Sequence, residues 1–422
     1  MSRFLFVVPP LVGHVNPAVG TAAVLAARGH DIAWAGPVDL VRRLAGPDAH
    51  VFPCVPPDAK PDHAGEIVGR TGHLKGPAAF QFLWERFLIP LADHMAPRIR
   101  TAIEEFRPDV VIADQQTIAG GIVAESLGLT WVTSATTSAE LVDPLAGMPK
   151  VAAWSDGLIE ALRGRIADGR GAADPRMSPY GVLAYTTRAL LGPVALPEQV
   201  WLVGPSLTDR PAPTDFPWEW LEGTERTVLV SLGTANAEAG GPFLNAAVQA
   251  LSGLPGVRAV VVDPAHNVAA AGENILLRPH VPQLPLLAHV DAVVCHAGHN
   301  TVCEALWNGV PLVVAPIRDD QPIVAGQVTA AGAGVRLRFG RADAGRIADA
   351  VGTVLDEAAG YRDAARAIGR SFRAAGGSVA AADRLEGLLP RATSPSIRRG
   401  PRPHDVEQGA ARRAVRGCSR GR

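Results

Sequence analysis

The chain has 422 residues and a formal net charge of −1, and 47% of its residues are hydrophobic. This length exceeds what one hydrophobic core usually supports, so we expect two domains. The four cysteines form no CxxC pair and no spacing typical of metal ligands, and no uninterrupted apolar run approaches the ~20 residues that span a bilayer. These features predict a cytoplasmic protein without stable insertion into a membrane.

The first half of the chain alternates short apolar runs with helical patterns, which is typical of parallel βα units. Residues 4–8 predict the first strand, residues 9–16 a turn, and the pattern that continues to about residue 27 a helix. A buried parallel strand reads as an unbroken apolar run. On this basis further strands are expected at residues 31–35, 110–113 and 130–132.

Residues 56–107 form a segment that is longer than an ordinary crossover between strands. The segment carries four aromatic residues, which are Phe80, Phe82, Trp84 and Phe87. Two interpretations stay open. These aromatics close over an apolar ligand, or they form the stripe of an amphipathic helix that packs on the sheet.

Residues 208–222 concentrate Pro and Asp between two patterned regions, which predicts a linker between domains. A second unit then begins with a strand at 227–232 and a turn at Gly233-Thr234. A helical pattern from 342 to 389 completes it. The strands expected between these limits are residues 258–262, 275–277, 292–295 and 312–315.

The last residues of the chain differ in composition from the rest. Residues 391–422 carry nine Arg against Asp405 and Glu407, and they lack apolar periodicity. This composition predicts a disordered basic tail. Most such tails are solvated, so we expect no nucleic-acid partner.

The stretch 280–321 brings together residue types that suit a nucleotide sugar. His296 and Gly298 lie between a predicted strand and the following helix. A helix N-terminus offers free backbone N–H groups and about half a positive charge, which suits a diphosphate. Glu304 offers a carboxylate for ribose hydroxyls, and beyond the next strand the pair Asp320-Gln321 offers polar groups for a sugar.

Four short motifs in this stretch resemble the signature of the family 1 glycosyltransferases, the UDP-glycosyltransferase superfamily, in its bacterial natural-product and macrolide branch. The motifs are His280-Val281-Pro282-Gln283, His296-Ala297-Gly298-His299-Asn300-Thr301-Val302-Cys303-Glu304, Gly309-Val310-Pro311 and Asp320-Gln321. Several matched positions over about 40 residues make this pattern more specific than a lone glycine motif.

The resemblance implies a GT-B fold, in which two Rossmann-like, doubly wound parallel sheets face each other across a cleft. Ligands of open α/β sheets bind outside the carboxyl ends of the strands. The expected divisions are an acceptor-binding domain at 1–207, a linker at 208–222, a nucleotide-sugar domain at 223–375, a helix at 376–390 that crosses back to the first domain, and the tail at 391–422.

The resemblance also assigns the donor site. His296, the backbone around Gly298–Thr301 and the Gly233-Thr234 turn are expected at the diphosphate. The family's Trp, whose ring stacks on the base, is His280 here, so UDP and dTDP donors both stay open. The full set of expected donor-binding residues is Gly233, Thr234, His280, Val281, Gln283, His296, Gly298, Asn300, Thr301, Glu304, Asp320 and Gln321.

The catalytic base is expected in the first βα turn. There Gly13-His14 and Pro17 match the family's Gly-His-x-x-Pro, whose histidine deprotonates the acceptor. A histidine accepts a proton near neutral pH, and a neighbouring carboxylate stabilises its charged form. Asp114, which ends the strand at 110–113, is the expected partner. Gly13, Trp84 and Phe87 are the candidate acceptor-binding residues.

Together these features predict an inverting, metal-independent transfer of a hexose from UDP or dTDP to a hydroxyl of an apolar natural product. No cofactor is expected, and a homodimer is possible. The pair Asp319-Asp320 is a candidate metal site, but the sugar-binding role of the pair Asp320-Gln321 fits the sequence better. Two alternatives are a nucleotide-sugar 2-epimerase and a non-catalytic homologue that activates another enzyme.

Overall fold

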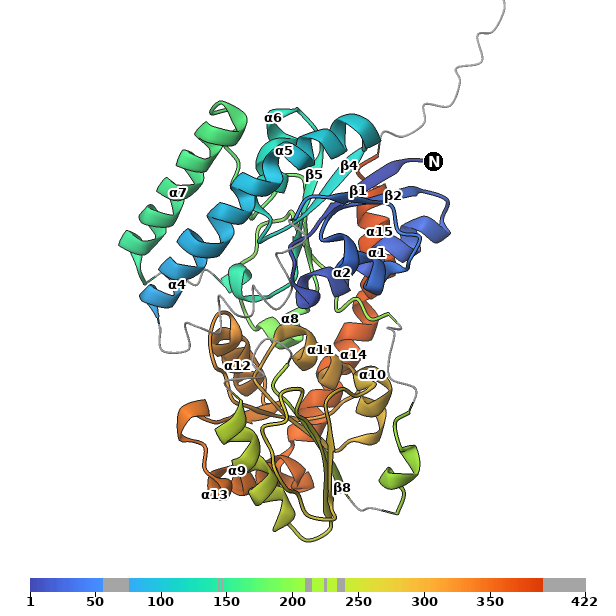
Figure 1. The fold of residues 1–422 in the computed structure, drawn as a ribbon, viewed down its shortest axis with the longest axis vertical. Coiled ribbons are helices and arrows are strands. Elements are labelled where there is room, and N and C mark those ends of the chain that lie inside the picture. Colours follow the sequence, from blue (N-terminus) through green and yellow to red (C-terminus); the bar gives the residue numbers. More distant parts are fainter. Residues whose placement is uncertain are drawn as a thin grey trace, which may run out of the picture. The chain divides into compact units, whose positions relative to one another are not determined.

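Two parallel sheets organise the computed structural model of the chain (Figure 1). The structure describes residues 1–55, 76–142, 145, 147–208, 215–223, 226–233 and 240–389. The first sheet is built from residues before the predicted linker and the second from residues after it. The prediction of two doubly wound α/β domains is therefore confirmed.

The first sheet has the strand order β3-β2-β1-β4-β5-β6-β7, so the order reverses between β1 and β4. Val7 pairs with Ala113 near the carboxyl ends of these two neighbours. This reversal is the place where an open parallel sheet binds its ligands. The strands are β1 Arg3–Val7, β2 Asp31–Gly36, β3 Val51–Pro53, β4 Val110–Asp114, β5 Trp131–Ala135, β6 Val182–Ala184 and β7 Val200–Leu202.

Helices cover both faces of the first sheet. In Figure 1, α5, α6 and α7 lie together on one face, and α1 and α2 lie on the other. The helical elements of this half are α1 Val12–Ala27, α2 Val38–Ala45, α4 Pro77–Leu83, the π-helical turn η1 Trp84–Leu88, α5 Ile89–Phe106, α6 Ile118–Ser126, the 3₁₀ turn η2 Ala139–Val142, α7 Pro149–Ala167 and α8 Arg188–Leu191.

The aromatic residues of η1 belong to the core of this half. Trp84 is 2% exposed and Phe87 is 8% exposed, and both pack in one cluster with Met95 and Ile99 of α5. Arg176 lies over the Trp84 ring. The structure therefore favours the packing interpretation of these two aromatics over the acceptor-binding role. The other part of the proposed acceptor segment, residues 56–75, lies outside the described residues.

The second sheet has the order β10-β9-β8-β11-β12-β13, which again reverses beside its first strand. Its strands are β8 Arg226–Ser231, β9 Val257–Val262, β10 Ile275–Arg278, β11 Ala292–Cys295, β12 Leu312–Val314 and β13 Gly334–Arg336. Its helical elements are α9 Gly241–Ser252, α10 Gln283–Leu286, η5 Leu287–His289, α11 His299–Trp307, α12 Gln321–Ala330, η6 Phe339–Arg341, α13 Ala344–Leu355, η7 Glu357–Ala359, α14 Tyr361–Ala375 and α15 Gly377–Glu386.

The last helix, α15, packs against α1 of the first half. At this contact Arg28 donates to Glu386 over 2.6 Å, and Nε2 of His30 lies 2.8 Å from the same carboxylate. The sequence placed a returning helix at 376–390, and α15 lies inside this range. The predicted linker contains the 3₁₀ turn η3 Trp218–Leu221, and the tail at 391–422 lies outside the described residues.

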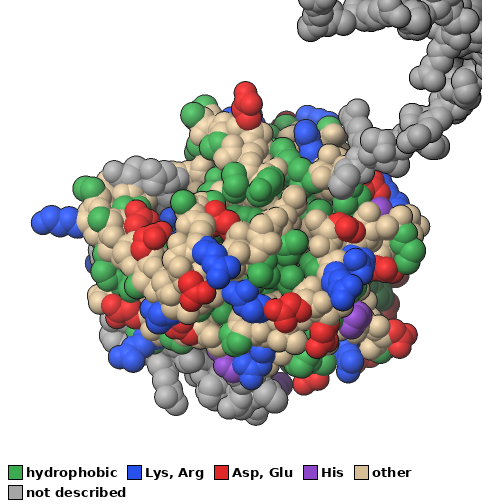
Figure 2. Space-filling view, turned by 90° about the horizontal axis from the view of Figure 1, so that it is seen from above, with side chains coloured by type: hydrophobic (Ala, Val, Ile, Leu, Met, Phe, Trp, Pro, Cys, Tyr) green, Lys and Arg blue, Asp and Glu red, His purple; other side chains and the backbone are tan. Residues whose placement is uncertain are grey.

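The surface carries mixed charge. On the face that Figure 2 shows, acidic and basic side chains are interspersed among hydrophobic ones. Within the described part of the chain, none of the helices has the length and apolar character needed to cross a membrane.

Candidate active site

The carboxyl ends of β1 and β4 place a histidine beside an aspartate. The two strands are neighbours, and Asp114 is the last residue of β4. His14 lies on the first turn of α1, which begins at Val12. The sequence predicted a turn as far as residue 16, and this was wrong. Leu11 is the extended residue before the helix, and the helix continues through Pro17.

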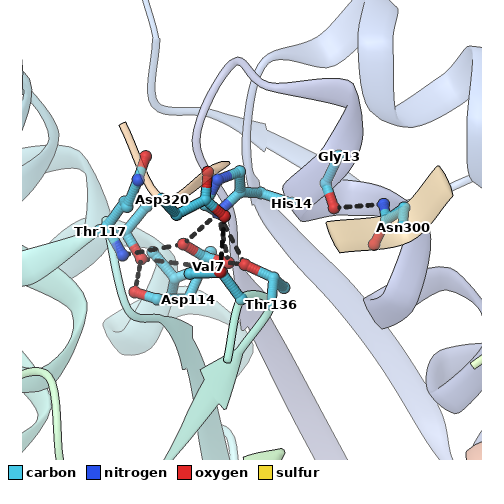
Figure 3. A network of polar contacts seen from close by, with 10 residues as sticks. Val7, Gly13, His14, Asp114, Thr117, Thr136, Asn300 and Asp320 are labelled. Atoms are coloured by element: carbon cyan, nitrogen blue, oxygen red, sulfur yellow. Dashed lines mark hydrogen bonds and ion pairs between the residues drawn. The ribbon is translucent and has the colours of Figure 1, made fainter. Parts of the chain in front are cut away.

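His14 and Asp114 form a buried dyad (Figure 3). Nδ1 of His14 lies 3.0 Å from both carboxylate oxygens of Asp114. The Asp114 side chain is fully buried and that of His14 is 16% exposed. The backbone N–H of Gln116 donates to Oδ1 of Asp114 over 2.8 Å, and this bond helps to hold the carboxylate in place.

The carboxylate determines the protonation of the imidazole. Burial acts to lower the pKa of His14, but the charge and hydrogen bond of Asp114 outweigh it, and the charge of Asp320 adds to them, so the pKa is raised. Because both Asp114 oxygens face Nδ1 and only accept, the neutral ring carries its proton on Nδ1. Nε2 is then the nitrogen that is able to accept a proton.

A hydroxyl completes this network. Thr136 follows β5, and its Oγ1 lies 2.8 Å from Nδ1 of His14 and donates to Oδ2 of Asp114 over 2.9 Å (Figure 3). Thr136 is 4% exposed. No motif in the sequence pointed to this residue, although the polar run Thr136-Thr137-Ser138 after a parallel strand was a signal for it.

The next two residues reach the second half of the chain. Oγ1 of Thr137 donates to Oδ2 of Asp320 over 2.5 Å, and Oγ of Ser138 donates to Oε1 of Gln327 over 2.6 Å. Asp320 precedes α12, and Gln327 lies on it. One three-residue segment therefore contacts the dyad, the residue before α12 and α12 itself.

A second contact between the halves depends on a proline. Pro17 has no N–H, so it leaves the carbonyl of Gly13 without the donor that a helix normally supplies four residues later. Nδ2 of Asn300 donates to this carbonyl over 2.8 Å (Figure 3). Asn300 was predicted at the diphosphate. In this structure its amide instead connects the first turns of α1 and α11.

The turn between β11 and α11 encloses the second histidine. A Cβ on Gly298 would lie 2.5 Å from Nε2 of His296, and one on Gly233 would lie 2.8 Å from its Cε1. Both predicted glycines therefore allow the imidazole to pack closely against the backbone. Ala297 has a φ of 67°, so this turn holds a left-handed residue that is not glycine.

His296 has the opposite protonation behaviour from His14. Burial lowers its pKa to about 4, against the opposing charge of Asp320. The ring is therefore neutral near pH 7, and one of its nitrogens is an N–H donor. Its Nδ1 is buried without a hydrogen-bond partner. Gly298 precedes the first residue of α11, so the helix N-terminus lies beside this ring.

Glu304 and Gln283 contact each other in this structure. Glu304 is 1% exposed, and Nε2 of Gln283 donates to its Oε2 over 2.6 Å. The sequence predicted both residues at the nucleotide, and the structure brings their side chains together. A small pocket between α1 and α11 includes Glu304. Its other lining residues include Asn16, Pro17, Tyr185, Ser206 and His299.

The other predicted donor-binding residues differ in their contacts and in their exposure. Oε1 of Gln321 accepts the backbone N–H groups of Ile317 and Arg318 over 2.9 and 3.1 Å, so this side chain fixes its own loop. His280 is exposed, Val281 and Thr301 are partly buried, and Thr234 lies outside the described residues.

His299 was left without a role by the sequence, and it is a buried contact between the halves. Its Nε2 lies 3.3 Å from the carbonyl oxygen of Tyr185, which lies just after β6. Nothing in the local pattern indicated this, because 114 residues separate the two partners.

Among the described residues, no group of three or more His, Cys, Asp or Glu side chains is arranged to hold a metal ion. The absence of a metal requirement stays a prediction, as do the roles of the individual site residues.

Comparisons with known proteins match nearly the whole chain. The sequence profile described as "UDP-glucoronosyl and UDP-glucosyl transferase" matches residues 206–370. The 4'-demethylrebeccamycin synthase of Lentzea aerocolonigenes is 30% identical, over 92% of this chain and 100% of its own length. The demethyllactenocin mycarosyltransferase of Streptomyces fradiae is 28% identical, over 92% of this chain and 87% of its own. The solved "glycotransferase of kitacinnamycin" is 26% identical, with a TM-score of 0.72 over 92% of this chain and 99% of that one.

Proposed function

The chain belongs to the family of UDP-glucuronosyl and UDP-glucosyl transferases and is a glycosyltransferase with the GT-B fold, and we propose that it moves a hexose from UDP or dTDP to a hydroxyl of an apolar natural product. The single observation that supports this proposal most is the His14–Asp114 dyad. The charge of Asp320, from the second half of the chain, also acts to raise the pKa of His14.

The proposed reaction is a direct displacement. Nε2 of His14 takes the proton of the acceptor hydroxyl while the oxygen bonds to the anomeric carbon of the sugar. The bond between that carbon and the diphosphate oxygen breaks on the opposite face, so the anomeric configuration inverts. Asp114 stabilises the imidazolium that forms.

Negative charge grows on the departing diphosphate, and the donor-side turn offers groups to receive it. The neutral His296 supplies an N–H, and the first turn of α11 supplies backbone N–H groups and the positive end of its dipole. Preorganised donors of this kind lower a barrier by roughly 3–4 kcal/mol each in other enzymes. We propose that these groups act without a metal ion.

The nature of the acceptor rests on the relatives. One relative is named 4'-demethylrebeccamycin synthase, and another is named demethyllactenocin mycarosyltransferase. We propose an acceptor of the same natural-product class, bound mainly by the first half of the chain. Glu304 and Gln283 are proposed at the ribose, and the pair Asp320-Gln321 at the sugar hydroxyls.

The test is turnover of a panel of UDP- and dTDP-sugars with aromatic and polyketide hydroxyl acceptors. Release of nucleoside diphosphate is measured for the wild type and for His14→Ala, with His289→Ala as a control at an exposed histidine of η5. We expect release that requires an acceptor and falls about 10²- to 10⁴-fold in His14→Ala alone. The coupling constant of the anomeric proton in the product reports inversion or retention.

Other outcomes separate the alternatives. Diphosphate release that needs no acceptor, with an isomerised sugar, identifies an epimerase. Turnover that survives His14→Ala removes the proposed base. Loss of turnover in the presence of a chelator, restored by Mg²⁺, contradicts metal independence.

A further inference from the structure

The hydroxyl of Thr136 occupies a position that the proposed reaction leaves unexplained. It lies within hydrogen-bonding distance of both members of the dyad, 2.8 Å from Nδ1 of His14 and 2.9 Å from Oδ2 of Asp114. Its side chain is almost completely buried, so water does not compete freely for these contacts.

The proton positions in this group of three follow from simple chemistry. The Asp114 carboxylate is an acceptor at both oxygens, so the proton between it and the ring belongs to Nδ1. A hydroxyl that lies near a protonated Nδ1 is unable to donate to it. Thr136 therefore donates its proton to Asp114 and offers a lone pair to the Nδ1–H of His14.

We propose that Thr136 is a positioning residue for the base, and this inference rests on the proposed function. The hydroxyl connects the ring and the carboxylate, so it fixes their relative orientation as well as their separation. It favours the tautomer with its proton on Nδ1, and it leaves Nε2 directed to the acceptor as a base. Thr136 transfers no proton itself.

The location of Thr136 gives this contact a fixed geometry. Asp114 ends β4, and Ser134 of the adjacent β5 pairs with it in the parallel register. Thr136 follows two residues later, so it rises from the same edge of the sheet as Asp114. The backbone N–H of Gln116 already holds Oδ1, and Thr136 holds Oδ2. Each carboxylate oxygen thus has its own donor besides the imidazole.

The experiment compares two substitutions that differ in one hydroxyl. Thr136→Val keeps the β-branched shape and removes the hydroxyl, whereas Thr136→Ser keeps the hydroxyl. The control is Thr353→Val, because Thr353 is exposed on α13 and its hydroxyl donates to the carbonyl of Asp349 in the same helix. All variants are assayed with the donor and acceptor that the panel above identifies.

We expect Thr136→Val to lower kcat about 10- to 100-fold, which is the scale of a lost hydrogen bond to a charged group. The KM for the donor is expected to stay within about twofold of the wild-type value. Thr136→Ser is expected to restore most of the rate. In an Asp114→Asn background, Thr136→Val is expected to add less than about threefold, because the two residues act through the same imidazole.

A measurement without substrate provides an independent test. In protein labelled with ¹⁵N-histidine, the Nδ1–H signal of His14 is the one that disappears in His14→Ala. We expect this proton to exchange with water faster in Thr136→Val than in the wild type or Thr136→Ser. An unchanged exchange rate contradicts the proposed contact.

The kinetic outcomes separate this inference from the proposed function. If His14→Ala abolishes turnover but Thr136→Val matches the wild type, only the role of Thr136 is wrong. If Thr136→Val instead raises KM for the donor and adds fully to Asp114→Asn, the hydroxyl binds the sugar and does not position the base. If His14→Ala retains turnover, the proposed base is wrong and the role of Thr136 as its positioning residue is wrong with it.

Discussion

Two strand-to-helix junctions, one in each half of the chain, each carry a histidine, and the two imidazoles have opposite protonation behaviour. After β1, His14 faces Asp114 and its pKa is raised. After β11, His296 packs between Gly233 and Gly298, and burial lowers its pKa to about 4. His14 lies within the first turn of its helix, whereas His296 lies in the loop before its helix.

The difference comes from the neighbours of each ring. Burial acts on both histidines in the same direction, because it disfavours the charged imidazolium. His14 has a carboxylate at hydrogen-bonding distance that reverses this effect, whereas His296 has backbone and glycines around it. One site therefore suits a base that becomes charged, and the other suits a neutral donor near an anion.

The largest expected effect comes from Asp114→Asn, which makes the surroundings of His14 similar to those of His296. Without the carboxylate, burial dominates and the pKa of His14 falls. The amide also permits the wrong tautomer. We expect kcat/KM to fall about 10²- to 10⁴-fold, and the acidic limb of its pH profile to move to lower pH.

The measurement is the pH dependence of kcat/KM for the wild type and Asp114→Asn. Circular dichroism and thermal unfolding serve as the control for folding. An acidic limb that stays at the same pH in Asp114→Asn shows that the limb belongs to another group.

Gly298→Ala perturbs the other turn and has a smaller expected effect. The φ of Gly298 is −60°, so its backbone accepts alanine, but the new Cβ would meet Nε2 of His296 at 2.5 Å. The ring then has to move away from the proposed position of the diphosphate. We expect roughly a 10-fold loss in donor affinity, on the scale of one lost hydrogen bond.

The matched control for this substitution is Gly157→Ala on α7, where the new Cβ meets nothing within 4 Å. Donor binding is measured by calorimetry with the nucleoside diphosphate. Equal affinities of the two variants contradict a diphosphate contact by His296.

The smallest expected effect is on stability, and its sign differs between the two histidines. His296 has a folded-state pKa of about 4 against 6.5 when unfolded, so the unfolded chain binds more protons between these values. Its contribution to stability is lost as pH falls from 6.5 to 4, by roughly 1–3 kcal/mol after allowance for partial exposure. The raised pKa of His14 has the opposite consequence, since its contribution is present below pH 6.5 and is lost as pH rises through the folded value.

Urea unfolding of His14→Gln and His296→Gln between pH 4.5 and 9 measures both contributions. We expect the stability difference between the wild type and His14→Gln to be larger at low pH. The corresponding difference for His296→Gln should be larger at high pH. Parallel pH dependences in the two variants contradict opposite pKa shifts.

The sequence predicted the βα framework well because strands of continuous apolar residues are a local signal. It missed β3, β6, β7 and β13, each of which has three residues and therefore few positions to form a pattern. β12 is equally short, but it was predicted because it is wholly apolar and follows the Gly-Val-Pro motif. The start of α1 was misplaced because Gly13 and Pro17 are typical of a turn. The helix continues through Pro17 instead, and Asn300 supplies the donor that the Gly13 carbonyl loses.

The geometry of the site was predictable only where it follows from topology. His14 and Asp114 come from neighbouring strand ends, so their contact follows from the strand order. The contact of Asn300 with Gly13 joins residues 287 positions apart, and Thr137 reaches Asp320 across 183 positions. These contacts depend on how the two halves meet, which no local pattern reports.

The contacts of α11 with the first half have a consequence for the substitutions that the junction between the halves tolerates. Asn300 binds the carbonyl of Gly13, and His299 lies 3.3 Å from the carbonyl of Tyr185. Both acceptors are backbone carbonyls, so a substitution at Tyr185 leaves the acceptor of His299 in place, whereas the free carbonyl of Gly13 also requires Pro17. The donors are side chains, so substitutions at Asn300 or His299 remove these contacts altogether. The tolerance of the junction to substitution is therefore unequal on its two sides.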